Sequence, residues 1–114
     1  MADEIRAHAR KVPISAQKLR LVVDLVRGKD VQEALETLRF VPNGAARPVS
    51  KLVASAMANA EENLGISRDD LYVYRIFADE GPTRKWRRFG GRGRFKPVLR
   101  RSSHVTVVLR EYQD

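Results

Sequence analysis

One long, positively charged segment constrains this chain more than any other feature of its sequence. Residues 82–101 contain nine lysines and arginines and no aspartate or glutamate. Residues 1–70 hold eleven cations and ten acids, a net charge of +1, and residues 71–114 hold eleven cations and four acids, a net charge of +7, which together give the formal +8. A run of like charges repels itself and cannot be packed into a core. The sequence therefore divides into a nearly neutral body and one concentrated basic segment.

The size and composition of the chain predict one domain. Its 114 residues, 43% of them hydrophobic, suffice for a single modest core. We expect one domain over residues 1–114, with a body of about residues 1–80 and 102–114 and a basic arm of about residues 81–101. The absence of cysteine excludes disulfides, thiol catalysis and cysteine-ligated zinc. The acidic start and the lack of an apolar stretch of about 18 residues predict a soluble, cytoplasmic protein.

Two amphipathic helices are predicted in the first third of the chain. The first follows Ser15, a good N-cap, has apolar residues spaced three and four apart, and ends at Gly28 after about three and a half turns. The second begins at Asp30, and Glu33 lies three residues further on, in a capping-box arrangement. It is expected to end near Phe40, just before a Val-Pro pair.

A third, longer helix is predicted to end at Gly65. Apolar residues keep helical spacing over about four turns, from Val49 to Leu64. If the helix starts at Asn43, which is a possible cap, Pro48 lies past the first turn and removes a hydrogen bond. We therefore expect either a kink near Pro48 or a helix that starts close to it.

Three strands complete the predicted fold. Residues 4–10 alternate between small apolar and polar side chains, and residues 71–78 and 104–109 are rich in aromatic and β-branched residues. The order is one strand, three helices and then a pair of strands. This order predicts an α+β fold in which three helices pack on a small three-stranded antiparallel sheet.

The basic segment connects the last two predicted strands. Residues 79–103 are far longer than an ordinary hairpin loop, so this connection is expected to be functional. If both strands continue outward, each side has about twelve residues and the arm is roughly 40 Å long. Gly90 and Gly91 lie near its middle, where a tight turn needs positive φ. We therefore predict a long basic β-hairpin arm.

The residues of the arm have the chemistry of an RNA-binding surface. Arginine and lysine contact phosphates, arginine also forms bidentate hydrogen bonds, and exposed aromatic rings stack on unpaired bases. The candidate RNA contacts of the arm are Arg84, Lys85, Trp86, Arg87, Arg88, Phe89, Arg92, Arg94, Phe95, Lys96, Arg100 and Arg101, with His104 beside them. The candidate contacts of the body are Arg6, Arg10, Lys11, Lys18, Arg27 and Lys29, each of which could equally be an ordinary surface charge.

The sequence gives little support for metal binding, catalysis or membrane binding. His8 and His104 are the only histidines, and neither has a metal-ligand partner at a useful spacing, so no metal site or cofactor is predicted. The acidic pairs at residues 69–70 and 79–80 lack the supporting groups of a catalytic site, and no enzyme activity or small-molecule substrate is predicted. Glycines and a proline in the basic segment oppose an amphipathic helix, so membrane binding is not expected.

Several stretches of the chain, in order, resemble the large-subunit ribosomal protein family twenty-two. They are SAQKLRLVVDLVRGK at residues 15–29, SAMANAEEN at residues 55–63, LYV and FADEGP within residues 71–82, RGR at residues 92–94, and RRSSHVT at residues 100–106. Phe89, Gly90 and Gly91 depart from the Pro-Arg-Ala common in that family. Phe95 and Lys96 replace its usual Ala-Asp, and Glu62 stands where many members have histidine. The length of the arm is unchanged, so the resemblance still implies a hairpin.

This resemblance implies a structural, non-catalytic role in the large ribosomal subunit of the cytoplasm. It implies that the chain binds several domains of the large-subunit rRNA, contacts neighbouring ribosomal proteins and supports assembly. The arm tip, at Phe89, Gly90, Gly91 and Arg92, would line the nascent-peptide tunnel. Two further hypotheses remain open: a free-standing RNA chaperone or DNA-binding module, and a protein-interaction module with an acidic partner.

Overall fold

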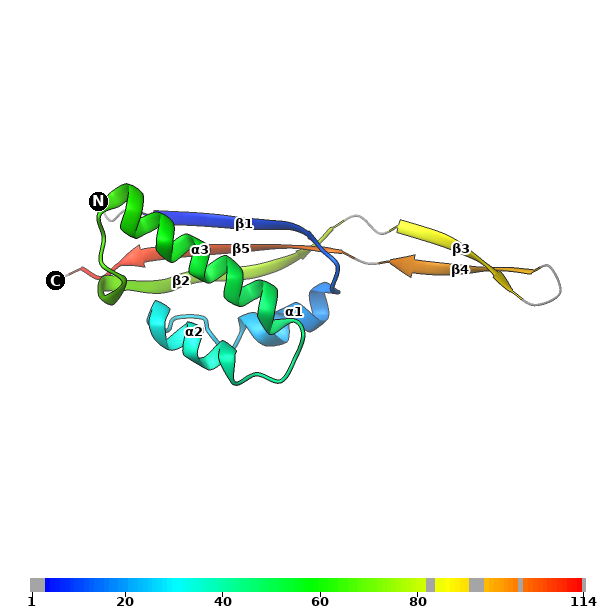
Figure 1. The fold of residues 1–114 in the computed structure, drawn as a ribbon, viewed down its shortest axis with the longest axis horizontal. Coiled ribbons are helices and arrows are strands. Elements are labelled where there is room, and N and C mark those ends of the chain that lie inside the picture. The colour runs from blue at the N-terminus through cyan, green and yellow to red at the C-terminus, as the bar shows by residue number, and fades with distance from the viewer. Residues whose placement is uncertain (1–3, 82–83, 91–93, 101, 114) are drawn as a thin grey trace.

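The computed structural model describes residues 4–81, 84–90, 94–100 and 102–113, with side chains described for residues 4–81 and 102–113. The elements, in chain order, are β1 (Glu4–Val12), α1 (Ala16–Val23), α2 (Val31–Arg39), α3 (Ala46–Leu64), a short 3₁₀ turn η1 (Arg68–Asp70), β2 (Leu71–Glu80), β3 (Arg84–Gly90), β4 (Arg94–Arg100) and β5 (Ser103–Glu111). The three helices lie together on one side of the sheet formed by β1, β2 and β5 (Figure 1). The predicted α+β fold is confirmed.

The body sheet is antiparallel and has the strand order β1-β5-β2. The last strand of the chain is therefore central, and it pairs with β1 from Glu4↔Arg110 to Val12↔Ser103. The alternation predicted for β1 is present, since Ile5 is buried and Ala7 and Ala9 are half-buried, with exposed polar residues between them. Both edges of β5 are covered by hydrogen-bonded partners, which places its apolar residues in the middle of the body.

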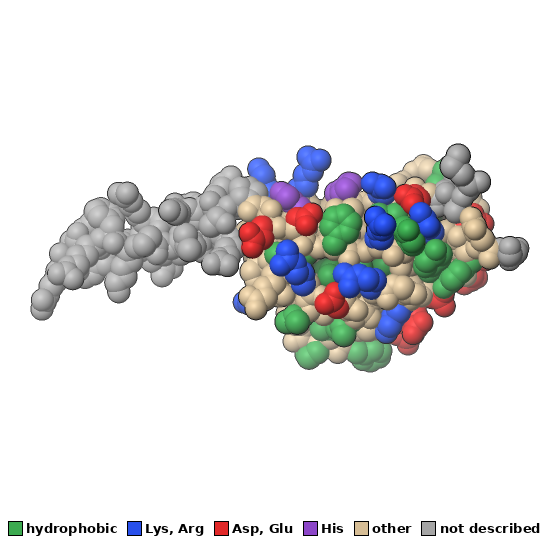
Figure 2. Space-filling view, turned by 180° about the vertical axis from the view of Figure 1, so that it is seen from behind, with side chains coloured by type: hydrophobic (Ala, Val, Ile, Leu, Met, Phe, Trp, Pro, Cys, Tyr) green, Lys and Arg blue, Asp and Glu red, His purple; other side chains and the backbone are tan. Residues whose placement is uncertain are grey.

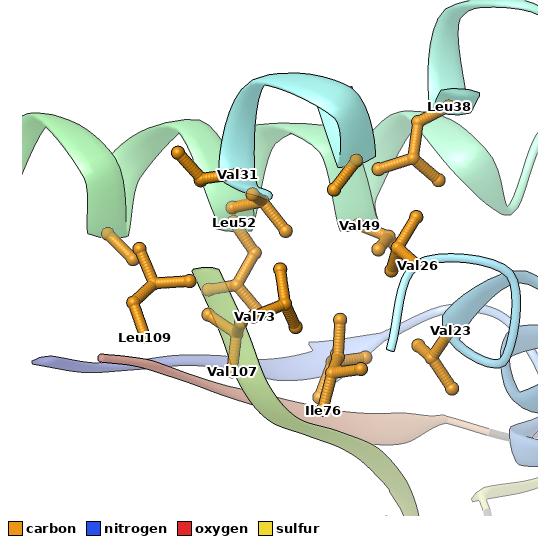
Figure 3. Close-up of a cluster of buried hydrophobic side chains, with 14 of the residues drawn as sticks. Val23, Val26, Val31, Leu38, Val49, Leu52, Val73, Ile76, Val107 and Leu109 are labelled. Carbon is orange, nitrogen blue, oxygen red and sulfur yellow. The ribbon is translucent and has the colours of Figure 1, made fainter. Parts of the chain in front are cut away.

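The core lies between the sheet and the helices. Val73 and Ile76 of β2 and Val107 and Leu109 of β5 point toward the helices (Figure 3) and are at most 1% exposed. They meet apolar side chains from α2, α3 and the segment that follows α1, among them Val26, Val31, Leu38, Val49 and Leu52. Burying an aliphatic side chain of this size contributes about 1.5–3 kcal/mol, so this single layer is the main source of the body's stability.

A β-bulge in β2 decides which side chains join that core. The register with β5 shifts between Val73, opposite Leu109, and Arg75, opposite Val108, so Tyr74 is the extra residue. An extra residue reverses the alternation of the strand beyond it. Val73 and Ile76 therefore both face the helices, although they are three residues apart, and Tyr74 and Arg75 remain on the other face.

Helix α1 is shorter than predicted, and the expected end at Gly28 is wrong. The helix ends at Val23, and the amide of Val26 then donates to the carbonyl of Val23 in a tighter turn. Gly28, at φ +80°, turns the chain so that its amide donates to the carbonyl of Val73 at 2.9 Å. Pairing with β2 thus replaces the last helical turn, and Val26 stays fully buried.

The starts of α2 and α3 differ in detail from the predicted caps. Asp30 precedes α2, but its carboxylate makes no capping bond, so the predicted capping box is wrong. It accepts a hydrogen bond from the hydroxyl of Tyr112 instead. Helix α3 starts at Ala46, and Asn43 accepts from the amide of Ala45 rather than capping the helix. Pro48 is then the third helical residue, where no amide hydrogen bond is lost. The expectation of a helix that starts close to Pro48 is therefore the correct one of the two.

The arm continues the body sheet outward. The amide of Gly81 donates to the carbonyl of Ser102 at 2.8 Å, and beyond it β3 and β4 form a separate antiparallel pair. Gly90, at the end of β3, pairs with Arg94 of β4, and Gly91 of the predicted turn lies outside the described residues. The molecule measures 67 × 26 × 19 Å, and its radius of gyration of 17.3 Å exceeds the value of about 13 Å for a compact chain of this length. The arm causes this elongation (Figure 1).

Candidate nucleic-acid interface

Most of the predicted RNA contacts lie on the two strands of the arm. The backbone of β3 holds Arg84, Lys85, Trp86, Arg87, Arg88 and Phe89, and that of β4 holds Arg94, Phe95, Lys96 and Arg100. Gly91, Arg92 and Arg101 lie outside the described residues. The hairpin thus brings together, over seven pairs of residues, cations that are up to sixteen positions apart in the sequence.

The register of the arm opposes cations to cations. Arg84 pairs with Arg100, and Arg88 pairs with Lys96. Like charges directly opposite one another on neighbouring strands are destabilising. An anionic partner removes this repulsion, so the hairpin is electrostatically suited to a polyanion.

A second group of predicted contacts gathers where the arm leaves the body. Val12, at the end of β1, pairs with Ser103, so the exposed side chains of Arg10 and Lys11 lie at the arm end of the sheet. Lys11 adopts φ +55° in a bulge, and its amide donates to Nδ1 of His104 at 3.2 Å. Lys18 lies nearby in the first turn of α1, exposed to solvent. The structure therefore brings Arg10, Lys11, Lys18 and His104 to one end of the body, next to the arm.

The remaining predicted body residues already have protein partners. Arg27 binds Oδ1 of Asp24 at 2.6 Å and the carbonyl oxygen of Ile76 at 2.8 Å, which ties the segment after α1 to β2. Lys29 donates to the hydroxyl of Thr37 at 3.3 Å. These bonds give both side chains a structural role within the body, whether or not they also contact RNA.

Arg6 lies farther from the arm, in a network on the sheet. Its guanidinium is 3.2 Å from Glu4, and Arg110 binds the other oxygen of that carboxylate. The hydrogen bond from Arg110, followed by that from Arg6, lowers the pKa of Glu4, and the same carboxylate raises the pKa of Arg110. Solvent and salt screen exposed pairs of this kind, so this network positions the side chains more than it stabilises the fold.

Sequence reasoning missed two further groups of cations and aromatic residues. Tyr74, Arg75, Phe77 and Arg110 line a depression on the face of the sheet away from the helices. A groove between α2 and α3 is lined by Arg39, Arg47 and Lys51. No sequence signal separates these residues from other surface residues, because the bulge at Tyr74 and the path of the α2–α3 connection decide their positions.

The described part of the chain offers no other evident site. Within residues 4–81 and 102–113, no three histidine or acidic side chains are close enough together to hold a metal ion. None of the described helices combines the length and the apolar character needed to cross a membrane. What the fold does present is a small α+β body with a projecting cationic hairpin, an arrangement typical of proteins that bind nucleic acid.

Comparisons with known proteins agree with this class. The sequence profile of the family described as "Ribosomal protein L22p/L17e" matches residues 7–110. The "Large ribosomal subunit protein uL22" of Pediococcus pentosaceus is 45% identical over 100% of this chain and 99% of its own length. The protein of the same name from a Thermoanaerobacter species is 51% identical over 95% of this chain and 97% of its own.

The chain therefore belongs to the L22p/L17e family of ribosomal proteins, which places it in the large subunit of cytoplasmic ribosomes. The family resemblance predicted from the sequence is confirmed.

Proposed function

We propose that this chain is a structural, non-catalytic component of the large subunit that binds large-subunit rRNA through its arm and the adjoining end of its body. The observation that carries the proposal is the set of nine cations, with no acidic residue among them, on a hairpin that leaves a nearly neutral body. Phosphate contacts dominate the affinity of proteins for nucleic acids, and arginine-rich surfaces supply them. Membership of a large-subunit family supports rRNA as the anion.

Binding is proposed to begin with electrostatic docking. The exposed side chains of Arg10, Lys11 and Lys18, the half-buried His104 beside them and the cations of the arm attract phosphates. This attraction overcomes the repulsion between the opposed cations of β3 and β4. Trp86, Phe89 and Phe95 then stack on unpaired bases. Contacts of one elongated molecule with several rRNA domains hold those domains together, which supports assembly.

The proposal extends to the tip of the arm. A hairpin that reaches inward through rRNA from a body at the subunit surface brings Phe89, Gly90, Gly91 and Arg92 to the nascent-peptide tunnel, whose wall they line. Neighbouring large-subunit proteins are the expected partners of the body. This part of the proposal rests on the family resemblance and on the elongated form of the molecule.

The test is the sedimentation of a cell lysate on a sucrose gradient, with and without RNase, followed by detection of this chain. We expect it to migrate with large subunits and intact ribosomes, to stay there at moderately high salt, and to be released by RNase. A chain that spreads over all RNA and washes off at modest salt would be a free nucleic-acid-binding module. A chain in a complex that is insensitive to RNase would indicate an acidic protein partner.

A further inference from the structure

The face of the body sheet that the helices leave uncovered combines cations with an exposed aromatic ring. We call it the outer sheet face, and it is formed by Glu4, Arg6, His8, Tyr74, Arg75, Phe77, Thr106, Val108 and Arg110. Figure 2 shows the body from behind, with both histidines in view and basic and apolar side chains intermixed around them. The outer sheet face adjoins the cluster at the root of the arm, because His104 lies two residues before Thr106 on β5, and it is distinct from the arm itself.

The central strand supplies the floor of this face. Thr106 and Val108 of β5 are 8% and 3% exposed, because side chains of the two flanking strands rise on either side. On one flank, Nδ1 of His8 lies 3.0 Å from the hydroxyl of Thr106. On the other flank, Phe77 pairs with Thr106 and is 40% exposed. The ring of Phe77 thus stands at the side of a shallow depression, open to solvent.

Guanidinium groups form the rim of the depression. The bulge turns both Tyr74 and Arg75 to the outer sheet face, and the guanidinium of Arg110 lies 3.4 Å from the centre of the Tyr74 ring. Arg6 and Arg110 share the carboxylate of Glu4. Arg75 lies 5.3 Å from the Tyr74 ring, and no carboxylate of the described residues is within ion-pair distance of it. Arg75 is therefore free to pair with an anion from outside the body.

An aromatic ring beside the unpaired guanidinium of Arg75 suits one kind of occupant. Unpaired bases stack on exposed rings of a sheet surface, and the adjoining phosphates pair with arginine. A protein partner is less well matched, because Phe77 is the one large apolar side chain exposed on the described part of this face. The strands β2 and β5 run from this face to the root of the arm (Figure 1). A single RNA strand can therefore contact both the outer sheet face and the arm.

We propose that the outer sheet face is a second RNA-contact surface, which holds an unpaired nucleotide with its base stacked on Phe77 and its phosphate beside Arg75. The inference rests on the proposed rRNA binding and adds to it a surface, a kind of nucleotide and two residues. In this arrangement the arm fixes the position of the molecule, and the outer sheet face recognises single-stranded RNA next to it.

The test compares variants of the full chain in which three arm cations are neutralised, as R87Q/R88Q/R94Q, so that the arm does not mask the body. Fluorescence anisotropy measures the Kd for a single-stranded oligoribonucleotide and for a duplex. Phe77→Ala is expected to weaken single-strand binding about tenfold, as loss of one stacked base would, and to leave duplex binding unchanged. Phe77→Tyr, which keeps the ring, is expected to retain the affinity. Phe40→Ala is the matched control, because Phe40 is 78% exposed but lies away from this face.

A second measurement does not depend on affinity. RNA that contains 4-thiouridine is photocrosslinked to the unaltered chain, and the tryptic peptide of residues 76–84 is expected to carry the crosslink. Equal affinities for Phe77→Ala and Phe40→Ala, together with no crosslink in this peptide, would overturn the inference. A crosslink at Phe77 in a chain that fails to sediment with ribosomes would leave this surface standing and remove only the proposed rRNA target. Ribosome association with no crosslink in this peptide and no effect of Phe77→Ala would leave the proposed rRNA binding standing and remove only the outer sheet face as a contact surface.

Discussion

Gly81 lies where the body sheet meets the arm, and its lack of a side chain is required there. A Cβ at this position would lie 2.8 Å from the hydroxyl oxygen of Ser102, 3.2 Å from its carbonyl oxygen and 3.3 Å from the ring of His104. The carbonyl accepts the Gly81 amide at 2.8 Å, so it cannot move away without loss of that bond. We expect Gly81→Ala to lower the free energy of unfolding by about 1–3 kcal/mol, as measured by urea denaturation.

The matched control for this substitution is Gly44→Ala. A Cβ at Gly44 meets no atom within 4 Å. Its effect should stay within about 0.5 kcal/mol, as for most surface changes. Equal stabilities of the two variants would show that the root of the arm can open without cost.

Tyr112 joins the end of β5 to the start of α2 through its hydroxyl. The hydrogen bond that it donates to Asp30, together with partial burial, raises the pKa of Tyr112 to about 12. Because the hydroxyl is the protonated form, its stabilisation is complete below the ordinary pKa of 10 and disappears as the pH rises through about 12. In an absorbance titration of tyrosinate, we expect a component near pH 12 that is absent from Tyr112→Phe.

Asp30→Asn tests the cause of this shift. An amide oxygen still accepts the hydrogen bond, but it lacks the charge that opposes formation of tyrosinate. The high-pH component should then move toward the ordinary pKa of 10. A component that stays near pH 12 in this variant would assign the shift to the hydrogen bond and to burial, and not to the charge of Asp30.

At the scale of elements, hydrophobic spacing was enough to predict the body. The apolar stripes of the three helices and the alternation in β1 each match one buried face, and the order of these elements allows few arrangements. Gly65, at φ +66° just after α3, ends that helix as predicted. These features are local, and local patterns are what a single sequence records best.

The missed features depend on contacts between distant segments. Nothing in the sequence around Val26 shows that the chain will pair with Val73, yet this pairing ends α1 five residues before Gly28. The bulge at Tyr74 likewise exists only in relation to β5, and it is the bulge that keeps Arg75 on the outer sheet face. The candidate site was therefore predictable where it forms one continuous basic run, and unpredictable where the fold assembles it.

The arm and the body are expected to separate as folding units. The strands β3 and β4 pair only with each other, whereas the body sheet closes at Glu80↔Ser103 and at the Gly81–Ser102 bond. Deletion of residues 85–96 leaves every described helix and body strand in place. We expect this variant to unfold cooperatively in urea, with a slope close to that of the full chain.

A broad, uncooperative transition in the deletion variant would show that the arm contributes to the core. Circular dichroism in the far ultraviolet provides the control, because the three helices should keep their signal. The same variant should lose most of its affinity for RNA, which separates the stability of the body from the function of the arm.

At the scale of the whole molecule, charge and shape act together. The body is nearly neutral, so it adds little long-range attraction, whereas the arm holds nine cations and no acid and therefore accounts for the whole net charge of +8. A compact protein with the same charge would present it on one surface patch. This elongated molecule can instead enter between RNA segments and contact phosphates on several sides.

This division of charge predicts how RNA affinity depends on salt. Each phosphate contact that is lost lowers the slope of log K against log salt by about 0.7–0.9. Neutralising Arg87, Arg88, Arg94 and Lys96 with glutamine should therefore lower the slope by about 3. Arg68→Gln removes one charge that is already paired with Glu61 at 2.8 Å, and it should leave the slope unchanged. If both proteins lost slope in proportion to net charge alone, the attraction would come from the overall field of the molecule, and the arm would have no special role in contacting phosphates.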